Sequence, residues 1–281
     1  MQRDVYMETI AKQGRLLFAI AIAALGAENV ICAHVSQIVF EGNPNGVPVL
    51  PYATSPFIAY LVGIIILAVG VSVAASIRPE FAATFLGLFF GVYTLVHLLP
   101  IIVARPRDLN ARTGVFEVLA LCASALTLSA CLKQKRASAP RSMGGTLVAL
   151  EVKAINTLTA SGPYLFAICS VVFGITHLLI PRAIASLVPA WIPGGLFWAY
   201  FTGAAFIAAG ISIVTGVLAR WGAFWQGVML LLWFLMLHAP RVALHPRIPA
   251  EWSSLFEVLG MSGGAWIVAS YVMQNSRRNE R

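Results

Sequence analysis

Two segments of this chain each place a glutamate ten residues after an arginine, just before an apolar run. One is PIIVARPRDLNARTGVFEVL, which contains Arg107 and Glu117, and the other is PRVALHPRIPAEWSSLFEVL, which contains Arg247 and Glu257. Each glutamate can pair with its arginine and fix the loop to the following helix. Alternatively, each can accept a proton or anchor a ligand in a polar cavity. The sequence leaves both interpretations open.

Further titratable residues fall near the ends of other apolar runs, and these are Glu28, His34, His97, His177 and His238. Ionisable side chains inside a membrane usually face the bundle interior or water. We therefore expect an outward-facing polar cavity in which Glu117 and Glu257 are the catalytic candidates. The other five residues, with Arg107 and Arg247, are ligand-binding candidates, although a histidine at a span end can equally be an interfacial residue. No H-x-x-x-H or H-E-x-x-H motif occurs, so no metal site is predicted.

The composition indicates that these residues lie in a membrane protein. Hydrophobic residues make up 59% of the chain and charged residues 11%, whereas soluble domains contain about 25% charged residues. This balance predicts a polytopic membrane protein. The formal net charge of +8 does not indicate nucleic-acid binding, because Lys and Arg gather at the ends of apolar runs, where membrane topology explains them.

Eight apolar runs are long enough to cross a bilayer as helices, at residues 16–34, 56–77, 81–104, 114–132, 163–181, 194–218, 221–242 and 253–273. The predicted fold is therefore all-α, with eight transmembrane helices in two tandem four-helix bundles. Most Lys and Arg residues lie on the side of both termini and of the central linker. This bias predicts a multi-pass protein of the cell (inner) membrane with both termini in the cytoplasm.

The two halves of the chain repeat one another. AYLVGIIILAVGVS in the first half matches AYFTGAAFIAAGIS in the second at an offset of 140 residues, and FEVL recurs at the same offset. In the first span the offset is 148, so the first copy carries an insertion within EGNPNGVPVLPYATSP. An even number of spans per copy gives both copies the same orientation. The predicted domains are residues 1–132, a basic flexible linker at 133–160, and residues 161–281.

The run HLLIPRAIASLVPAWIPGGLFWAYFTGAAFIAAGISIVTG, from His177 to Gly216, resembles the DoxX-like family of small four-span membrane proteins, in which VPxWxPG…FWxYxTG…AAG is typical. The first copy keeps Tyr60, Gly63 and Gly70 but lacks the Trp and the Thr-Gly pair. The resemblance implies two fused DoxX-like units. The wider group includes a membrane subunit of thiosulfate:quinone oxidoreductase, partners of thiol-handling enzymes and an animal relative that assists receptor assembly. It therefore implies the fold more strongly than the chemistry.

Three functions are compatible with these features. The first is a redox-linked subunit that holds a quinone, or a similar apolar molecule, between the two copies. Glu117 and Glu257 would exchange protons, Arg107 and Arg247 would hold an oxyanion or the carboxylates, and a soluble or membrane partner would supply electrons. The second is an assembly or scaffold protein with its arginine-rich outer loops as a docking surface. The third is a small-molecule transporter, although helices broken at mid-membrane are not evident.

Overall fold

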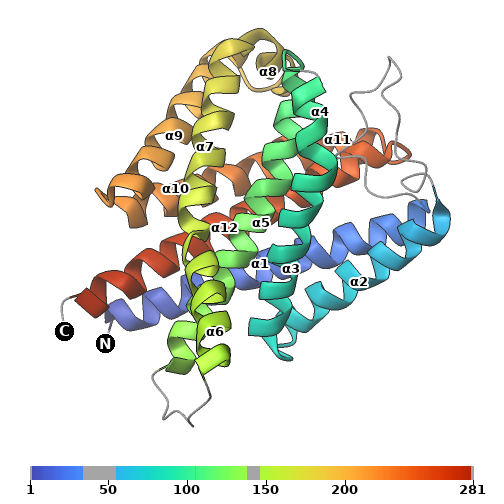
Figure 1. Cartoon of the computed structure of the whole chain (residues 1–281). Coiled ribbons are helices and arrows are strands. Elements are labelled where there is room, and N and C mark those ends of the chain that lie inside the picture. The colour runs from blue at the N-terminus through green and yellow to red at the C-terminus, as the bar shows by residue number, and fades with distance from the viewer. Residues whose placement is uncertain (1, 34–54, 105, 138–145, 280–281) are drawn as a thin grey trace.

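The computed structural model describes residues 2–33, 55–104, 106–137 and 146–279, and this part of the chain is helical with no strand (Figure 1). His34 and the predicted insertion in the first copy, up to residue 54, lie outside it. The first copy contains α1 (Gln2–Cys32), α2 (Pro56–Ala74), α3 (Pro79–Tyr93), the π-helix η2 (Thr94–Leu98), α4 (Leu99–Ala104) and α5 (Leu109–Ala137). The second contains α6 (Thr146–Ala160), α7 (Gly162–Leu179), α8 (Pro181–Leu187), α9 (Gly195–Thr215), α10 (Ala219–Trp233), the π-helix η3 (Phe234–His238), α11 (Ala239–Leu244) and α12 (Pro249–Asn279).

The eight predicted spans are confirmed as helices, and the protein is an all-α polytopic membrane protein. Helices long and apolar enough to cross a bilayer run over Glu8–Cys32, Pro56–Ala74, Pro79–Val96, Arg112–Gln134, Lys153–Leu179, Gly195–Thr215, Ala219–Leu244 and Pro249–Ser276. One part of the predicted linker differs from the expectation. Residues Thr146–Ala160 form α6, which adjoins α7, because TLVALEVKAINTLTA contains no Gly or Pro and is rich in helix-forming residues.

The third span of each copy contains one π-helical turn at the same place. η2 and η3 begin 140 residues apart, and each is followed closely by a proline, Pro100 or Pro240. A proline has no backbone N–H, so the carbonyl four residues before it loses its α-helical donor. The backbone N–H of Leu99 instead donates to the carbonyl of Thr94, and the equivalent bond forms 140 residues later. Such turns often mark functional positions in helices.

The turns between the second and third spans also repeat. Ser76 and Arg78 precede α3 with φ of 61° and 44°, and their equivalents before α10, Gly216 and Leu218, have φ of 78° and 54°. Left-handed backbone at a residue with a side chain costs about 1–2 kcal/mol. Both copies therefore use the same tight connection, although only the second uses a glycine in it.

The two copies interleave, and this packing has no counterpart in the sequence pattern. α1 packs against α2 and α12, whereas α7 packs against α9 and α5, so the first helix of each copy lies against the last helix of the other (Figure 1). Small residues permit this approach. A Cβ atom on Gly263 of α12 would lie 2.5 Å from the backbone nitrogen of Phe18, and one on Gly162 of α7 would lie 2.7 Å from that of Thr127.

The last helices, α5 and α12, cross at the centre of the molecule. Gly264 lies against Ser124, its own equivalent at the offset of 140, and a Cβ atom on Gly264 would come 1.9 Å from Ser124 Oγ. Equivalent residues can touch in this way only near the pseudo-two-fold axis. In their most apolar stretches, 78% of the α5 span and 83% of the α12 span are buried, against 28% for α2 and 22% for the span containing α10. α5 and α12 thus form the core, and the other spans surround them.

Candidate functional site at the seam of the first and last helices

Four buried polar side chains gather where α1 lies along α12, and we call them the seam cluster: Glu28 and Asn29 from α1, and Ser253 and Glu257 from α12. Their exposed fractions are 6%, 2%, 2% and 3%. The Ser253 hydroxyl donates a hydrogen bond to Glu28 Oε1 and so joins the two helices directly. All four lie within the membrane spans.

Helical periodicity and small residues position this cluster. Ser253 and Glu257 are four residues apart, so both side chains lie on the same face of α12. On α1, Asn29 lies beside Gly63 of α2, where a Cβ atom would stand only 3.0 Å from Asn29 Cβ. A Cβ atom on Gly26 would likewise meet the Gly63 carbonyl at 2.7 Å. α2 therefore holds the last turns of α1 against α12.

The cluster places two carboxyl groups and other polar atoms in an apolar surrounding. Glu28 Oε2 is buried and accepts no hydrogen bond from the described residues. A buried polar atom without a partner costs about 1–3 kcal/mol, and more when it carries charge. Ionisable groups inside membranes usually mark proton or ligand sites. The seam cluster is therefore the best candidate site in the described part of the chain.

Glu117, the equivalent of Glu257, has different surroundings. It lies on α5, which packs against α7, and its side chain is only partly buried. The α7 residues equivalent to Glu28 and Asn29 are Thr176 and His177. The Thr176 hydroxyl donates to the carbonyl of Val172, within its own helix, at 2.9 Å. The second seam thus has one carboxylate where the first has two.

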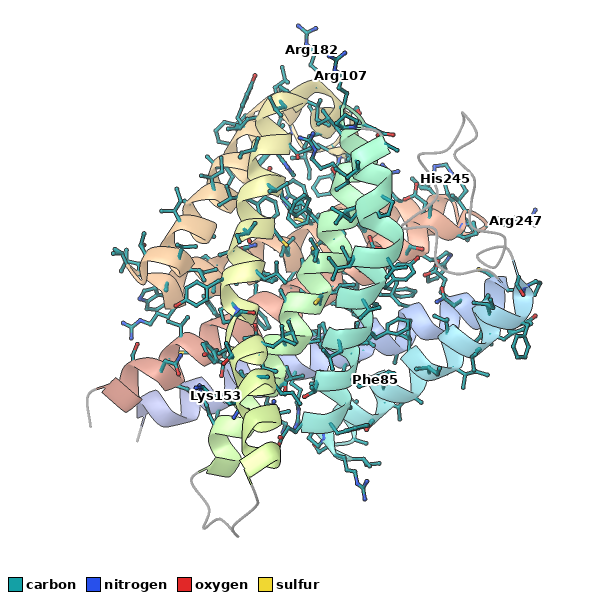
Figure 2. The ribbon with its side chains drawn as sticks, in the orientation of Figure 1. Phe85, Arg107, Lys153, Arg182, His245 and Arg247 are labelled. Carbon is teal, nitrogen blue, oxygen red and sulfur yellow. The ribbon has the colours of Figure 1, made fainter. Side chains whose placement is uncertain are left out.

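The predicted pairs of Arg107 with Glu117 and of Arg247 with Glu257 do not form among the described residues. Arg107 and Arg247 are exposed and point away from the helices (Figure 2). Glu257 lies eight residues into α12, about 12 Å along its axis, too deep for an arginine that precedes the helix. Instead, Arg241 donates two hydrogen bonds to Glu251 in the first turn of α12, at 2.8 Å and 2.7 Å.

The two candidate histidines with described side chains, His177 and His238, have separate local surroundings. His177 Nδ1 lies 2.8 Å from the Phe173 carbonyl oxygen, and its ring centroid is 5.4 Å from that of Phe206 on α9. His238 ends η3, and its buried Nδ1 has no hydrogen-bond partner among the described residues. The backbone of His97 lies in η2, but its side chain is outside the description. Within the described ranges, no group of three His, Cys, Asp or Glu residues could hold a metal ion.

Sequence reasoning did not identify Ser253, the residue that connects the two seam helices. The available signal was a serine one helical turn before Glu257, at the start of an apolar span. Its importance depends on the contact between the first and last helices, which local patterns do not contain. No family model, no curated protein and no solved structure matches this chain.

Proposed function

We propose that this integral membrane protein is a redox-linked subunit that binds a quinone, or a similar apolar molecule, beside the seam cluster. The observation that carries the proposal is the burial of two carboxylates, Glu28 and Glu257, between membrane-spanning helices. Reduction of a quinone to a quinol consumes two electrons and two protons. Carboxyl groups beside the ligand are suitable proton donors for this reaction.

The resemblance to the DoxX-like family supports the same choice, since that group includes a subunit of a quinone oxidoreductase. An apolar ligand can also enter from the bilayer between helices, without an aqueous channel. In this proposal Glu257 and Glu28 exchange protons, Ser253 orients Glu28, and a partner protein supplies the electrons. Glu117, on the less polar seam, has a secondary role.

The test compares two equivalent carboxylates. Wild-type protein, Glu257→Gln and the matched control Glu117→Gln are purified in mild detergent, and retained small molecules are identified by mass spectrometry of solvent extracts. We expect about one quinone per wild-type chain, loss of it in Glu257→Gln, and retention in Glu117→Gln. Extracts that contain only bulk lipid in all three samples would refute the proposal.

A second candidate function, an assembly protein for a partner complex, is favoured by one observation. Arg107, which follows the end of α4, and Arg182, in the first turn of α8, are both exposed, and Figure 2 shows both at the same end of the molecule. Exposed cations at one end of a molecule can dock an acidic surface. If they do, Arg107→Glu/Arg182→Glu should abolish co-purification of the partner, whereas the distant control Lys153→Glu should not. A complex that survives the double reversal would exclude this function.

A further inference from the structure

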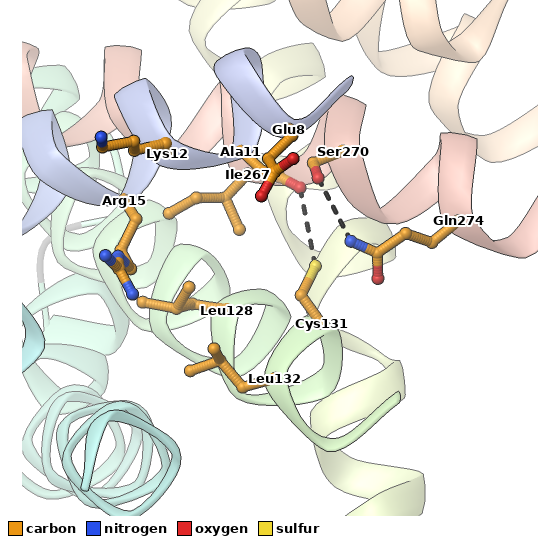
Figure 3. Close-up of a pocket in the computed structure, with 10 residues that line it drawn as sticks. All are labelled: Glu8, Ala11, Lys12, Arg15, Leu128, Cys131, Leu132, Ile267, Ser270 and Gln274. Carbon is orange, nitrogen blue, oxygen red and sulfur yellow. Dashed lines mark hydrogen bonds between the residues drawn. The ribbon is translucent and has the colours of Figure 1, made fainter. Parts of the chain in front are cut away.

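A pocket of about 210 Å³ lies at the opposite end of α1 from the seam cluster, where α1, α5 and α12 converge (Figure 3). α1 contributes Lys12 and Arg15, and α12 contributes Ser270 and Gln274. Leu128 of α5 is among the apolar residues that complete the lining. These positions lie near the ends of three membrane spans, so the pocket is at the level where a bilayer meets water.

We propose that this pocket binds the phosphate headgroup of an anionic membrane lipid, and that the headgroup carries free hydroxyls, as a glycerol headgroup does. Lys12 and Arg15 supply positive charge at the rim, with Glu8 as the one acidic lining residue. Basic pockets between transmembrane helices are suited to anionic headgroups. Arg15 adds a planar set of donors that matches phosphate oxygens.

The size of the pocket favours a headgroup over a whole ligand. Pockets for drug-sized molecules occupy about 300–1,000 Å³, so this one is too small for a complete lipid or a long-chain quinone. The acyl chains would remain outside, along α1. Leu16 and Ile20 continue the helical stripe that begins at Lys12, and they are 46% and 47% exposed. A basic residue followed by two exposed apolar residues along α1 matches a lipid, in which the charged headgroup is followed by the acyl chains.

The amide of Gln274 indicates the chemistry of the headgroup. Its Nε2 donates to Ser270 Oγ at 3.3 Å, whereas its Oε1 is buried and accepts no hydrogen bond from the described residues. A glycerol hydroxyl in the pocket would supply the missing donor. Phosphatidic acid has no headgroup alcohol and so offers this oxygen no glycerol hydroxyl.

The second copy provides an internal contrast. The residues equivalent to Lys12, Arg15 and Ser270 are Ala160, Pro163 and Ala130. The corresponding place between α7, α12 and α5 therefore lacks both cations and the hydroxyl. The two cations and this serine are thus present at only one of the two equivalent places, whereas the packing features occur at both.

The experiment is native mass spectrometry of the full-length protein released from detergent with added lipid. The probes are phosphatidylglycerol, phosphatidic acid, phosphatidylcholine and inorganic phosphate. We expect one phosphatidylglycerol to bind preferentially, and Lys12→Gln/Arg15→Gln to weaken it about 30-fold, since each cation near an anionic lipid contributes about a factor of five. Lys153→Gln/Arg220→Gln removes the same charge elsewhere and should leave binding unchanged.

Two further arms test the lipid class. Gln274→Leu should abolish the preference for phosphatidylglycerol over phosphatidic acid while both still bind. Equal binding of phosphatidylcholine, equal losses in the two double variants, or full competition by inorganic phosphate at equal concentration would each overturn the lipid assignment. Thermal unfolding in detergent checks that every variant is folded. Because the pocket lies at the other end of α1, these results do not depend on the quinone test.

Discussion

The seam between α1 and α12 and the seam between α7 and α5 are two versions of one interface. Both bring the first helix of one copy against the last helix of the other, and both depend on small residues. Gly14 meets Gly263 in the first seam, and Gly162 meets Ala123 in the second. The backbone packing has thus been retained in both copies.

The side chains of the two seams differ where the packing is the same. Ser253 donates across the first seam to Glu28. Its equivalent Thr113 donates at 2.8 Å to the carbonyl of Leu109, within its own helix. Duplication therefore preserved the scaffold, while buried carboxylates were concentrated on one side of the axis. This difference in side chains is the reason for placing the proposed site at the first seam rather than the second.

The largest loss of stability is expected from a substitution at the crossing of α5 and α12, because each of these two helices forms part of one seam. In Gly264→Val the new side chain would overlap Ser124 Oγ, which lies 1.9 Å from the ideal Cβ position. Overpacking of this kind should destabilise the fold by about 3 kcal/mol. Thermal unfolding in detergent and the yield of monodisperse protein measure the loss.

Gly91→Ala is the matched control for this substitution. The nearest atom to a Cβ on Gly91 is Cys122 Sγ at 3.6 Å, so the alanine fits and gains about 1 kcal/mol of helix propensity. If Gly264→Val unfolds at the same temperature as Gly91→Ala, the close crossing at the pseudo-two-fold axis is wrong.

Smaller losses of stability, which should differ between the two seams, are expected from removing the equivalent hydroxyl in each. Ser253→Ala removes the hydrogen bond to Glu28 and leaves both carboxylate oxygens of a buried residue without a described partner. The expected cost is about 1–3 kcal/mol. Thr113→Ala removes only a bond within one helix, and we expect a cost of about 0.5 kcal/mol. Chemical denaturation of both variants in the same detergent gives the two values, and equal costs would contradict the functional distinction between the seams.

The eight spans and the repeat could be predicted because they depend on local sequence patterns. Each span is an uninterrupted apolar run bounded by Gly, Pro or charge, and the copies align residue by residue. The partners of α1 and α7 were not predictable, since hydropathy does not say which apolar face meets which. The interleaving depends on small residues such as Gly263, which in sequence are indistinguishable from other glycines in apolar runs.

The candidate site was predicted only in part, for a related reason. Glu28 and Glu257 were identified as intramembrane acids, but their proximity depends on the same contact between the first and last helices. The pairing of Glu257 with Arg247, one of the two interpretations that the equal spacing left open, does not form among the described residues. The turn that ends α11, in which the His245 backbone N–H donates to the Arg241 carbonyl at 2.8 Å, instead leaves Arg241 beside Glu251.

That ion pair occurs in one copy only, since the residues equivalent to Arg241 and Glu251 are the uncharged Ile101 and Ala111, and its removal should have the smallest effect on stability. The Arg241 side chain is 37% exposed and that of Glu251 12%. Because water and salt screen an exposed pair, we expect a coupling energy of about 0.5–1 kcal/mol. A double-mutant cycle with Arg241→Ala and Glu251→Ala measures it, and the coupling should fall as salt is raised. Arg247→Ala should leave stability unchanged, so a comparable loss in that variant would restore the pairing that the ten-residue spacing first suggested.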